Sequence, residues 1–149
     1  MELEKNTLYR EIIMEHYKNP QNSGLVPNLK EYSVKNPVCG DSITIQLEIE
    51  NDIIKNIHQK SIGCSISTSS TSIMSELLKG KTILKAKDIV ENYYKMVKGE
   101  PYDENCELEE ANAFSGVKDY PARFHCATAI AEAILKAITD YEKLKEEKK

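Results

Sequence analysis

The sequence predicts a small α+β protein in which an antiparallel sheet of about three strands is covered on one face by helices. Residues 42–50 alternate apolar and polar side chains without interruption, which is typical of a strand with one buried face and one wet face. Several longer stretches repeat apolar residues at three- and four-residue steps, which indicates amphipathic helices. The order helix, strands, helices favours α+β. A length of 149 residues suits one domain over 1–149.

The first element is predicted to be a helix over residues 4–18. Leu8 and Ile12 form one apolar series, and Tyr9, Ile13 and His16 form another beside it. The helix must end near residue 19, because the proline at position 20 disfavours helical backbone before it. His16 lies in the last turn, and we interpret it as a helix-end residue favoured by the helix dipole. Residues 21–28 are rich in turn formers and predict a loop.

The sheet is predicted from three segments. Residues 32–35 indicate a short strand, and residues 42–50 and 53–62 indicate two longer strands. Asn51 and Asp52 form the turn between the last two, which therefore make an antiparallel hairpin. His58 falls in the return strand, and we interpret it as a solvated or edge residue.

The remaining elements are helical. A serine-rich run follows residue 64, but Ile66, Ile73, Leu77 and Leu78 form a helical stripe that ends near Gly80, which disfavours the alternative of a flexible linker. Residues 83–98 predict another helix, and residues 111–117 a short one. A sustained apolar stripe predicts a long C-terminal helix over residues 121–144, with proline tolerated in its first turn.

Composition excludes several classes of function. The net charge is −4 and no basic run is present, so nucleic acid is not an expected partner. No apolar stretch approaches the roughly 18 residues of a membrane span, and the N-terminus lacks an apolar signal core. We therefore expect a cytoplasmic protein whose cysteines are ligands, nucleophiles or core residues rather than disulfides.

A candidate metal site begins with Cys39 and Asp41, which are separated by a glycine that allows the chain to turn tightly. A thiolate and a carboxylate that face one point suit a metal ion. Cys64 and Cys126 each stand near the start of a predicted helix, where the dipole favours a thiolate. These four residues would make a complete ligand set. The alternative is a set of scattered buried thiols, since free cysteine is often simply core.

Two other residues bear on this site. His125 stands directly before Cys126 and is a further candidate ligand. Cys106 lies in an acidic stretch with no potential ligand near it in the sequence, and we interpret it as a bystander thiol.

Three motifs resemble those of the U-type iron–sulfur cluster assembly proteins, the group formed by IscU, SufU and the N-terminal domain of NifU. They are Asn-Pro-Val-Cys-Gly-Asp at 36–41, Gly-Cys-Ser-Ile-Ser at 63–67 and Pro-Ala-Arg-Phe-His-Cys-Ala at 121–127. Residues 8–20 also resemble the first helix of that family, so the resemblance covers nearly the whole chain.

The resemblance implies a site of three cysteines and one aspartate, here Cys39, Asp41, Cys64 and Cys126, with His125 matching an extra histidine of the IscU branch. In the family this site holds zinc or a nascent [2Fe–2S] cluster, and sulfur arrives from a cysteine desulfurase as a persulfide. The expected partners are that desulfurase and downstream cluster acceptor or scaffold proteins. Cys39 is our choice of sulfur acceptor, because the glycine after it should make its loop the most mobile of the three.

The long segment between Cys64 and Cys126 and the Pro-Ala-Arg at 121–123 are most similar to the SufU branch. The Leu-Pro-Pro-Val-Lys motif by which IscU docks its chaperone is missing. Only His125 points to the IscU branch.

Three functions follow as hypotheses. The first is an assembly protein that accepts sulfur and builds or passes on a [2Fe–2S] cluster. An aspartate among thiolates suits this function, because a mismatched oxygen donor should exchange readily. The second is a zinc-dependent sulfurtransferase that accepts sulfur on Cys39 without being the scaffold. The third is a structural zinc domain, which Asp41 disfavours because such sites use mostly cysteine and histidine.

Overall fold

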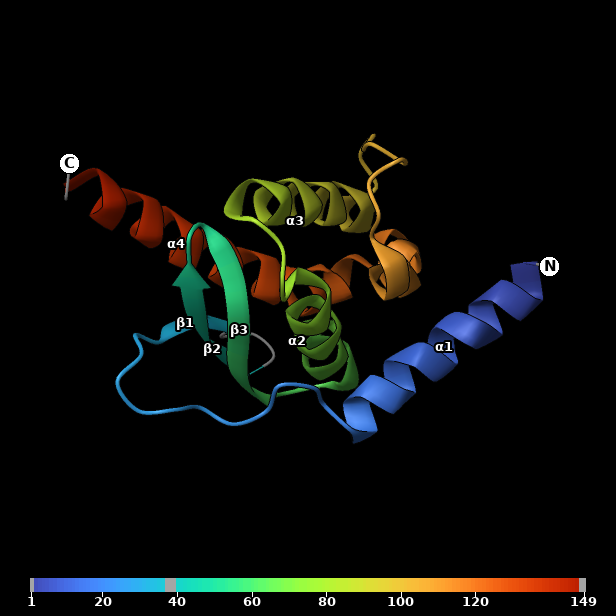
Figure 1. Ribbon diagram of the computed structural model, residues 1–149. Helices are drawn as coiled ribbons and strands as arrows, with labels where there is room; N and C mark the ends of the chain where they lie inside the picture. The colour runs from blue at the N-terminus through green and yellow to red at the C-terminus, as the bar shows by residue number, and fades with distance from the viewer. Residues whose placement is uncertain (1, 37–39, 148–149) are drawn as a thin grey trace.

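The computed structural model describes residues 2–36 and 40–147, and its chain forms one sheet with helices packed around it (Figure 1). In chain order the elements are α1 (Glu2–Lys18), β1 (Tyr32–Asn36), β2 (Asp41–Glu50), β3 (Ile53–Ile62), α2 (Ser65–Leu78), α3 (Ile83–Lys98), the 3₁₀ helices η1 (Glu109–Asp119) and η2 (Pro121–Arg123), and α4 (Phe124–Glu147). The two ends of the described chain lie on opposite sides of the molecule.

The sheet has the order β1-β2-β3 and is antiparallel throughout, as the sequence predicts. The β2–β3 turn is made by Asn51 and Asp52, whose φ angles of 53° and 61° both lie in the left-handed region. Two consecutive residues of this kind are the mark of a tight hairpin turn whose twist matches its strands. The turn sets the pairing of Glu50 with Ile53, and the register then shifts by one residue between Glu48 and Ile49. The hairpin ends at the pair of Ser42 and Ile62, from which the chain leads to α2.

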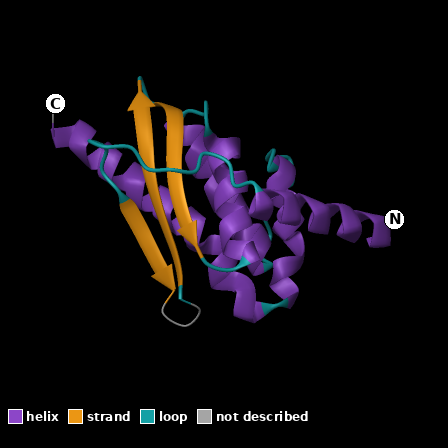
Figure 2. Cartoon of the chain, turned by 90° about the horizontal axis from the view of Figure 1, so that it is seen from below, coloured by secondary structure: helices purple, strands orange, loops and turns teal. Residues whose placement is uncertain are grey.

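The helices α2 and α4 cover one face of the sheet, which agrees with the predicted architecture (Figure 2). Alternate residues of β2 and β3 turn to these helices, and Ile43, Ile45 and Ile57 are almost completely buried there. The helix α4 adds Ile130, Ile134 and Ile138 to the same core. Burial of such side chains contributes roughly 1.5–3 kcal/mol each, so this layer holds α2 and α4 firmly against the strands.

The opposite face of the sheet is not simply wet, which corrects the expectation from the alternating pattern. Gln46 on this face is completely buried, because the segment between α1 and β1 crosses over it. Gln59 pairs with Ile45 and so lies on the helix-covered face, where it is buried beside the same segment as that segment runs along the edge of β3. The Gln46 amide bonds the backbone of Val26 and Leu29, and the Gln59 amide donates to the carbonyl of Gln21. These side chains satisfy the backbone of a segment that has no helix or strand of its own.

The serine-rich run forms the helix α2, so the alternative of a flexible linker is wrong. Nine consecutive residues, from Ser67 to Ser75, are buried against neighbouring elements. Small side chains allow the close approach of α1 and α4 to this helix. Most of the hydroxyls bond to carbonyls of the preceding turn, which removes the cost of burying them.

His16 lies in the last turn of α1, as predicted. It is also buried, with its Nδ1 2.7 Å from the Ser72 hydroxyl and its Nε2 3.3 Å from Glu110. The short helix expected at 111–117 is a longer 3₁₀ helix over Glu109–Asp119. His58 bonds Glu48 on the neighbouring strand at 2.7 Å and is half-buried. None of the helices in the described part of the chain has the length and apolarity needed to span a membrane.

Candidate metal centre

Asp41 opens β2 and carries a buried carboxylate, with only 4% of the residue exposed. Gly40 before it has a φ of +75°, in the region that favours glycine, and its amide bonds the carbonyl of Asn36 to close the turn. Oδ1 of Asp41 accepts a hydrogen bond from the backbone amide of Cys64 at 3.1 Å. This hydrogen bond connects Asp41, the first residue of β2, to Cys64, the residue before α2.

Gly63 makes this contact possible. A Cβ atom at position 63 would lie 2.3 Å from Oδ1 of Asp41, far inside van der Waals contact. Only a residue without a side chain leaves room for the carboxylate at this point. Gly63 belongs to the second of the three motifs. The sequence offers no signal for that role, since the close approach involves a residue 22 positions away.

Cys64 is the N-cap of α2, as its place before a predicted helix led us to expect. Its Sγ atom accepts a hydrogen bond from the backbone amide of Ser67 at 3.5 Å. The same sulfur lies 3.7 Å from Oδ2 of Asp41, to which the thiol donates. The Cys64 sulfur therefore lies at the start of α2, between the first turn of that helix and the Asp41 carboxylate. The Cys64 side chain is half-buried, so it can be approached from solvent.

Cys126 lies in the first turn of α4, because that helix begins two residues before it and is preceded by η2. The Tyr93 hydroxyl donates to the carbonyl of Ala127 at 2.7 Å and so holds this turn in place. The Cys126 side chain is buried. Burial raises the pKa of the Cys126 thiol, and the neighbouring Asp41 carboxylate and Cys64 sulfur raise that pKa further.

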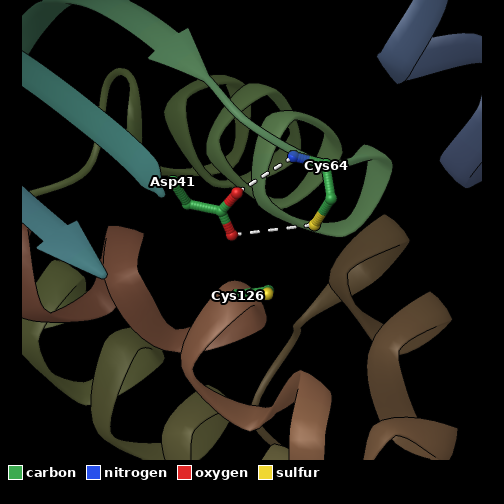
Figure 3. Close-up of side chains that lie close together, drawn as sticks. All are labelled: Asp41, Cys64 and Cys126. Atoms are coloured by element: carbon green, nitrogen blue, oxygen red, sulfur yellow. Dashed lines mark hydrogen bonds between the residues drawn. The ribbon is translucent and has the colours of Figure 1, made fainter. Parts of the chain in front are cut away.

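The three side chains converge, although their residues are spread over 86 positions of the chain (Figure 3). One ligand atom from each of Asp41, Cys64 and Cys126 lies within 4.8 Å of the other two. Two thiols and a carboxylate oxygen in this arrangement are ligands that zinc or iron accepts. A cation among them would compensate the negative charges that raise the pKa of Cys126, so the donor set fits a metal ion.

The other sequence-predicted site residues fall in different places. Cys39, the expected sulfur acceptor and fourth ligand, lies outside the described residues. His125 is exposed, and its ring stacks edge-on against Phe124 at a centroid distance of 5.3 Å. Cys106 is buried with its Sγ atom 3.8 Å from Asp88, and it is not part of the group that converges on Asp41.

Known proteins resemble this chain in sequence. The sequence model of the family described as "NifU-like N terminal domain" matches residues 8–123. The zinc-dependent sulfurtransferase SufU of Bacillus subtilis is 37% identical over 92% of this chain and 93% of its own length. The iron–sulfur cluster assembly scaffold protein IscU of Streptococcus pyogenes is 33% identical over 89% of this chain and 84% of its own.

A solved structure shows the same similarity. It comes from Fervidobacterium islandicum AW-1 and is described as a candidate iron–sulfur cluster assembly scaffold protein for the SUF system. It superimposes with a TM-score of 0.81 at 32% identity, and the match covers 86% of this chain and 94% of that one.

Proposed function

Because the chain belongs to the NifU-like N-terminal domain family, we propose that it acts in iron–sulfur cluster assembly. In this proposal it accepts sulfur from a cysteine desulfurase and builds or passes on a [2Fe–2S] cluster. The observation that carries the proposal is the convergence of Asp41, Cys64 and Cys126 from three separate elements. The proposed centre consists of these three residues and Cys39, which stands two positions before Asp41 in the sequence.

The sulfur-accepting step is assigned to Cys39. Its thiolate attacks the outer sulfur of a persulfide on the donor, a new S–S bond forms, and the donor's own cysteine leaves as a thiolate. The other two cysteines suit this role less well. The Cys64 sulfur accepts a hydrogen bond from a backbone amide of α2, and the Cys126 side chain is buried. When bound, zinc would keep the thiolates deprotonated at neutral pH.

A second function, zinc-dependent sulfur transfer without cluster building, is favoured by the positions of two residues. Asp41 lies with the two cysteines, whereas His125 is exposed beside Phe124. A centre completed by Asp41 needs no histidine ligand, and the relative with 37% identity carries the name of a zinc-dependent sulfurtransferase. Sulfur transfer on zinc is therefore the second candidate function within the proposed process, beside the building or passing on of a cluster.

The remaining parts of the proposal concern partners and setting. The sulfur donor is a cysteine desulfurase, and the products go to downstream cluster acceptor or scaffold proteins. The proposal treats residues 1–149 as one domain, which the shared core of sheet and helices supports. The cytoplasmic location stays a prediction.

Purification without air, followed by metal analysis and an absorption spectrum, tests the proposal and separates its two forms. Zinc with a colourless protein favours sulfur transfer, whereas iron, sulfide and a visible charge-transfer band favour the scaffold. Incubation with a cysteine desulfurase and cysteine should add sulfur to the protein, as mass spectrometry would show. Absence of both metal and added sulfur would contradict the proposal in either form.

A further inference from the structure

The Ser67 hydroxyl is buried without a hydrogen-bond partner. Among the side chains that the structure describes, its Oγ atom is the buried polar atom that lacks one. The residue is completely buried. A buried hydroxyl that makes no hydrogen bond lowers stability, so such a group calls for an explanation.

The other hydroxyls of α2 show that Ser67 has an alternative it does not use. A serine or threonine in a helix can donate to a carbonyl three or four residues earlier. Four residues of α2 do so: Ser69, Ser70, Thr71 and Ser75. Ser67 makes no such bond, although its own backbone amide donates to the Cys64 sulfur. The hydroxyl thus remains available at the end of α2 where the metal centre lies.

The side of α2 on which Ser67 stands can be inferred from Ser70, one turn further on. The Ser70 hydroxyl lies 3.4 Å from the carbonyl of Cys126, so this side of α2 faces the first turn of α4. Side chains of a helix lean toward its N-terminus, which at Ser67 means toward Cys64 and Asp41. The Ser67 hydroxyl therefore stands between the end of α2 and the turn that carries Cys126.

We propose that the Ser67 hydroxyl is a hydrogen-bond donor for the Cys126 sulfur when that sulfur is a metal-bound thiolate. This inference rests on the proposed metal centre and adds a positioning residue to it. A thiol that loses its proton to bind a cation gains negative charge and accepts hydrogen bonds more strongly. The cost of leaving Ser67 unpaired in the metal-free protein is then recovered when metal binds.

This role predicts effects of opposite sign in the two forms of the protein. Ser67→Ala removes an unsatisfied hydroxyl from the metal-free protein, so its stability should be unchanged or higher. The same change removes a donor from the metal-bound thiolate, so metal affinity should fall. A purely structural serine would lower the stability of the metal-free protein and leave the metal site unchanged.

Cobalt(II) is the probe for the test, because its thiolate complexes absorb visibly and it occupies zinc sites. Ser67→Ala should bind cobalt about tenfold more weakly, the loss expected for one hydrogen bond to a charged group. Its thiolate-to-cobalt band should move to lower energy, since an unbonded thiolate gives up charge more easily. Ser67→Thr keeps the hydroxyl and should retain the wild-type band position.

Ser69→Ala is the matched control, because it removes a buried hydroxyl of the same helix that already bonds the Ser65 carbonyl. It should lower the urea midpoint of the metal-free protein and leave the cobalt spectrum unchanged. Wild-type cobalt affinity and band position in Ser67→Ala would overturn the inference while leaving the metal centre intact. A wild-type protein without any thiolate-to-cobalt band would overturn the metal centre, and the inference with it.

Discussion

The backbone amide of Cys64 donates a hydrogen bond to Oδ1 of Asp41 at 3.1 Å, and this contact joins the start of β2 to the start of α2. It places a buried carboxylate 3.7 Å from the Cys64 sulfur. Because Gly63 leaves the space that the carboxylate occupies, the geometry of the centre depends on a residue that is not itself a ligand.

Gly63→Ala should disturb the centre without touching a ligand. The added methyl group would lie 2.3 Å from Oδ1 of Asp41, so the carboxylate must move. Zinc affinity should fall by about 10- to 100-fold, the range found when groups that support ligands are changed. Gly116→Ala is the control, since its methyl group would meet nothing within 4 Å. Equal zinc affinity of the two variants in a chelator competition would contradict the account.

Cys39→Ser should abolish sulfur acceptance, whereas Cys106→Ser should leave it intact. Cys39 is the proposed acceptor, and the Cys106 sulfur contacts Asp88 rather than the converging group. Mass spectrometry after incubation with desulfurase and cysteine detects the added sulfur. Undiminished labelling of Cys39→Ser would move the acceptor role to Cys64 or Cys126.

Asp41→Ala and His125→Ala should differ in their effect on metal binding. Asp41 is buried next to two sulfurs, so its loss should weaken zinc binding by at least tenfold. His125 is exposed, so His125→Ala should retain zinc affinity and the lifetime of a reconstituted cluster. A shorter cluster lifetime in His125→Ala would instead favour the scaffold function, with the histidine as an exchange ligand.

His16→Ala should lower the free energy of unfolding by about 1 kcal/mol, since the change removes a buried hydrogen bond to Ser72. His16 joins α1 to α2 and η1 through Ser72 and Glu110. Zinc affinity should stay unchanged, because the hydrogen bonds of His16 go to Ser72 and Glu110 and not to Asp41, Cys64 or Cys126. His58 lies on a more exposed part of the sheet, so His58→Ala should lower the free energy of unfolding by less than His16→Ala does. Urea unfolding of the zinc-free proteins measures the stability of both variants. An unchanged urea midpoint for His16→Ala would show that the contacts of His16 with α2 and η1 do not stabilise the fold.

Asp140 should give the protein a stability that is lost in acid. A hydrogen bond from the Tyr32 hydroxyl, aided by Lys30, holds the pKa of Asp140 below its usual value. Since the unfolded chain takes up this proton first, the carboxylate stabilises the fold above a pH of about 3.9. That contribution disappears as the pH falls through the lower pKa of the folded state.

Asp140→Asn should therefore be less stable than wild type at neutral pH and should lose less stability on acidification. Urea midpoints between pH 6 and pH 2.5 measure this, with the exposed Asp119→Asn as the control. Parallel curves for wild type and Asp140→Asn would show that the contact between α4 and β1 does not carry this pH dependence.

Much of the fold follows from local patterns. The bounds of Ile53–Ile62 and Ile83–Lys98 agree with the sequence prediction, because each has strong periodicity and clear turn residues at its ends. The positions whose burial the sequence did not indicate depend on distant partners. Gln46 is buried only because the segment around Val26 crosses over it. His16 is buried because Ser72 lies 56 residues away in the sequence but next to it in space.

The convergence of Asp41, Cys64 and Cys126 was predictable to the same extent. Helix starts indicated where Cys64 and Cys126 stand, and the motifs indicated that they share a centre with Asp41. The supporting contacts were not predictable. The space beside Gly63 and the free hydroxyl of Ser67 are properties of packing between elements, and a single sequence carries no period or spacing that reports them.

Zinc K-edge X-ray absorption of the anaerobically purified, zinc-loaded protein tests the central claim most directly, because it counts the atoms around the metal by element. The account predicts three sulfur atoms at about 2.3 Å, from Cys39, Cys64 and Cys126, and one oxygen at about 2.0 Å, from Asp41. In Asp41→Ala the protein oxygen should be lost while the three sulfurs remain. A first shell of oxygen and nitrogen alone in the wild-type protein would contradict the claim that these residues form one metal centre.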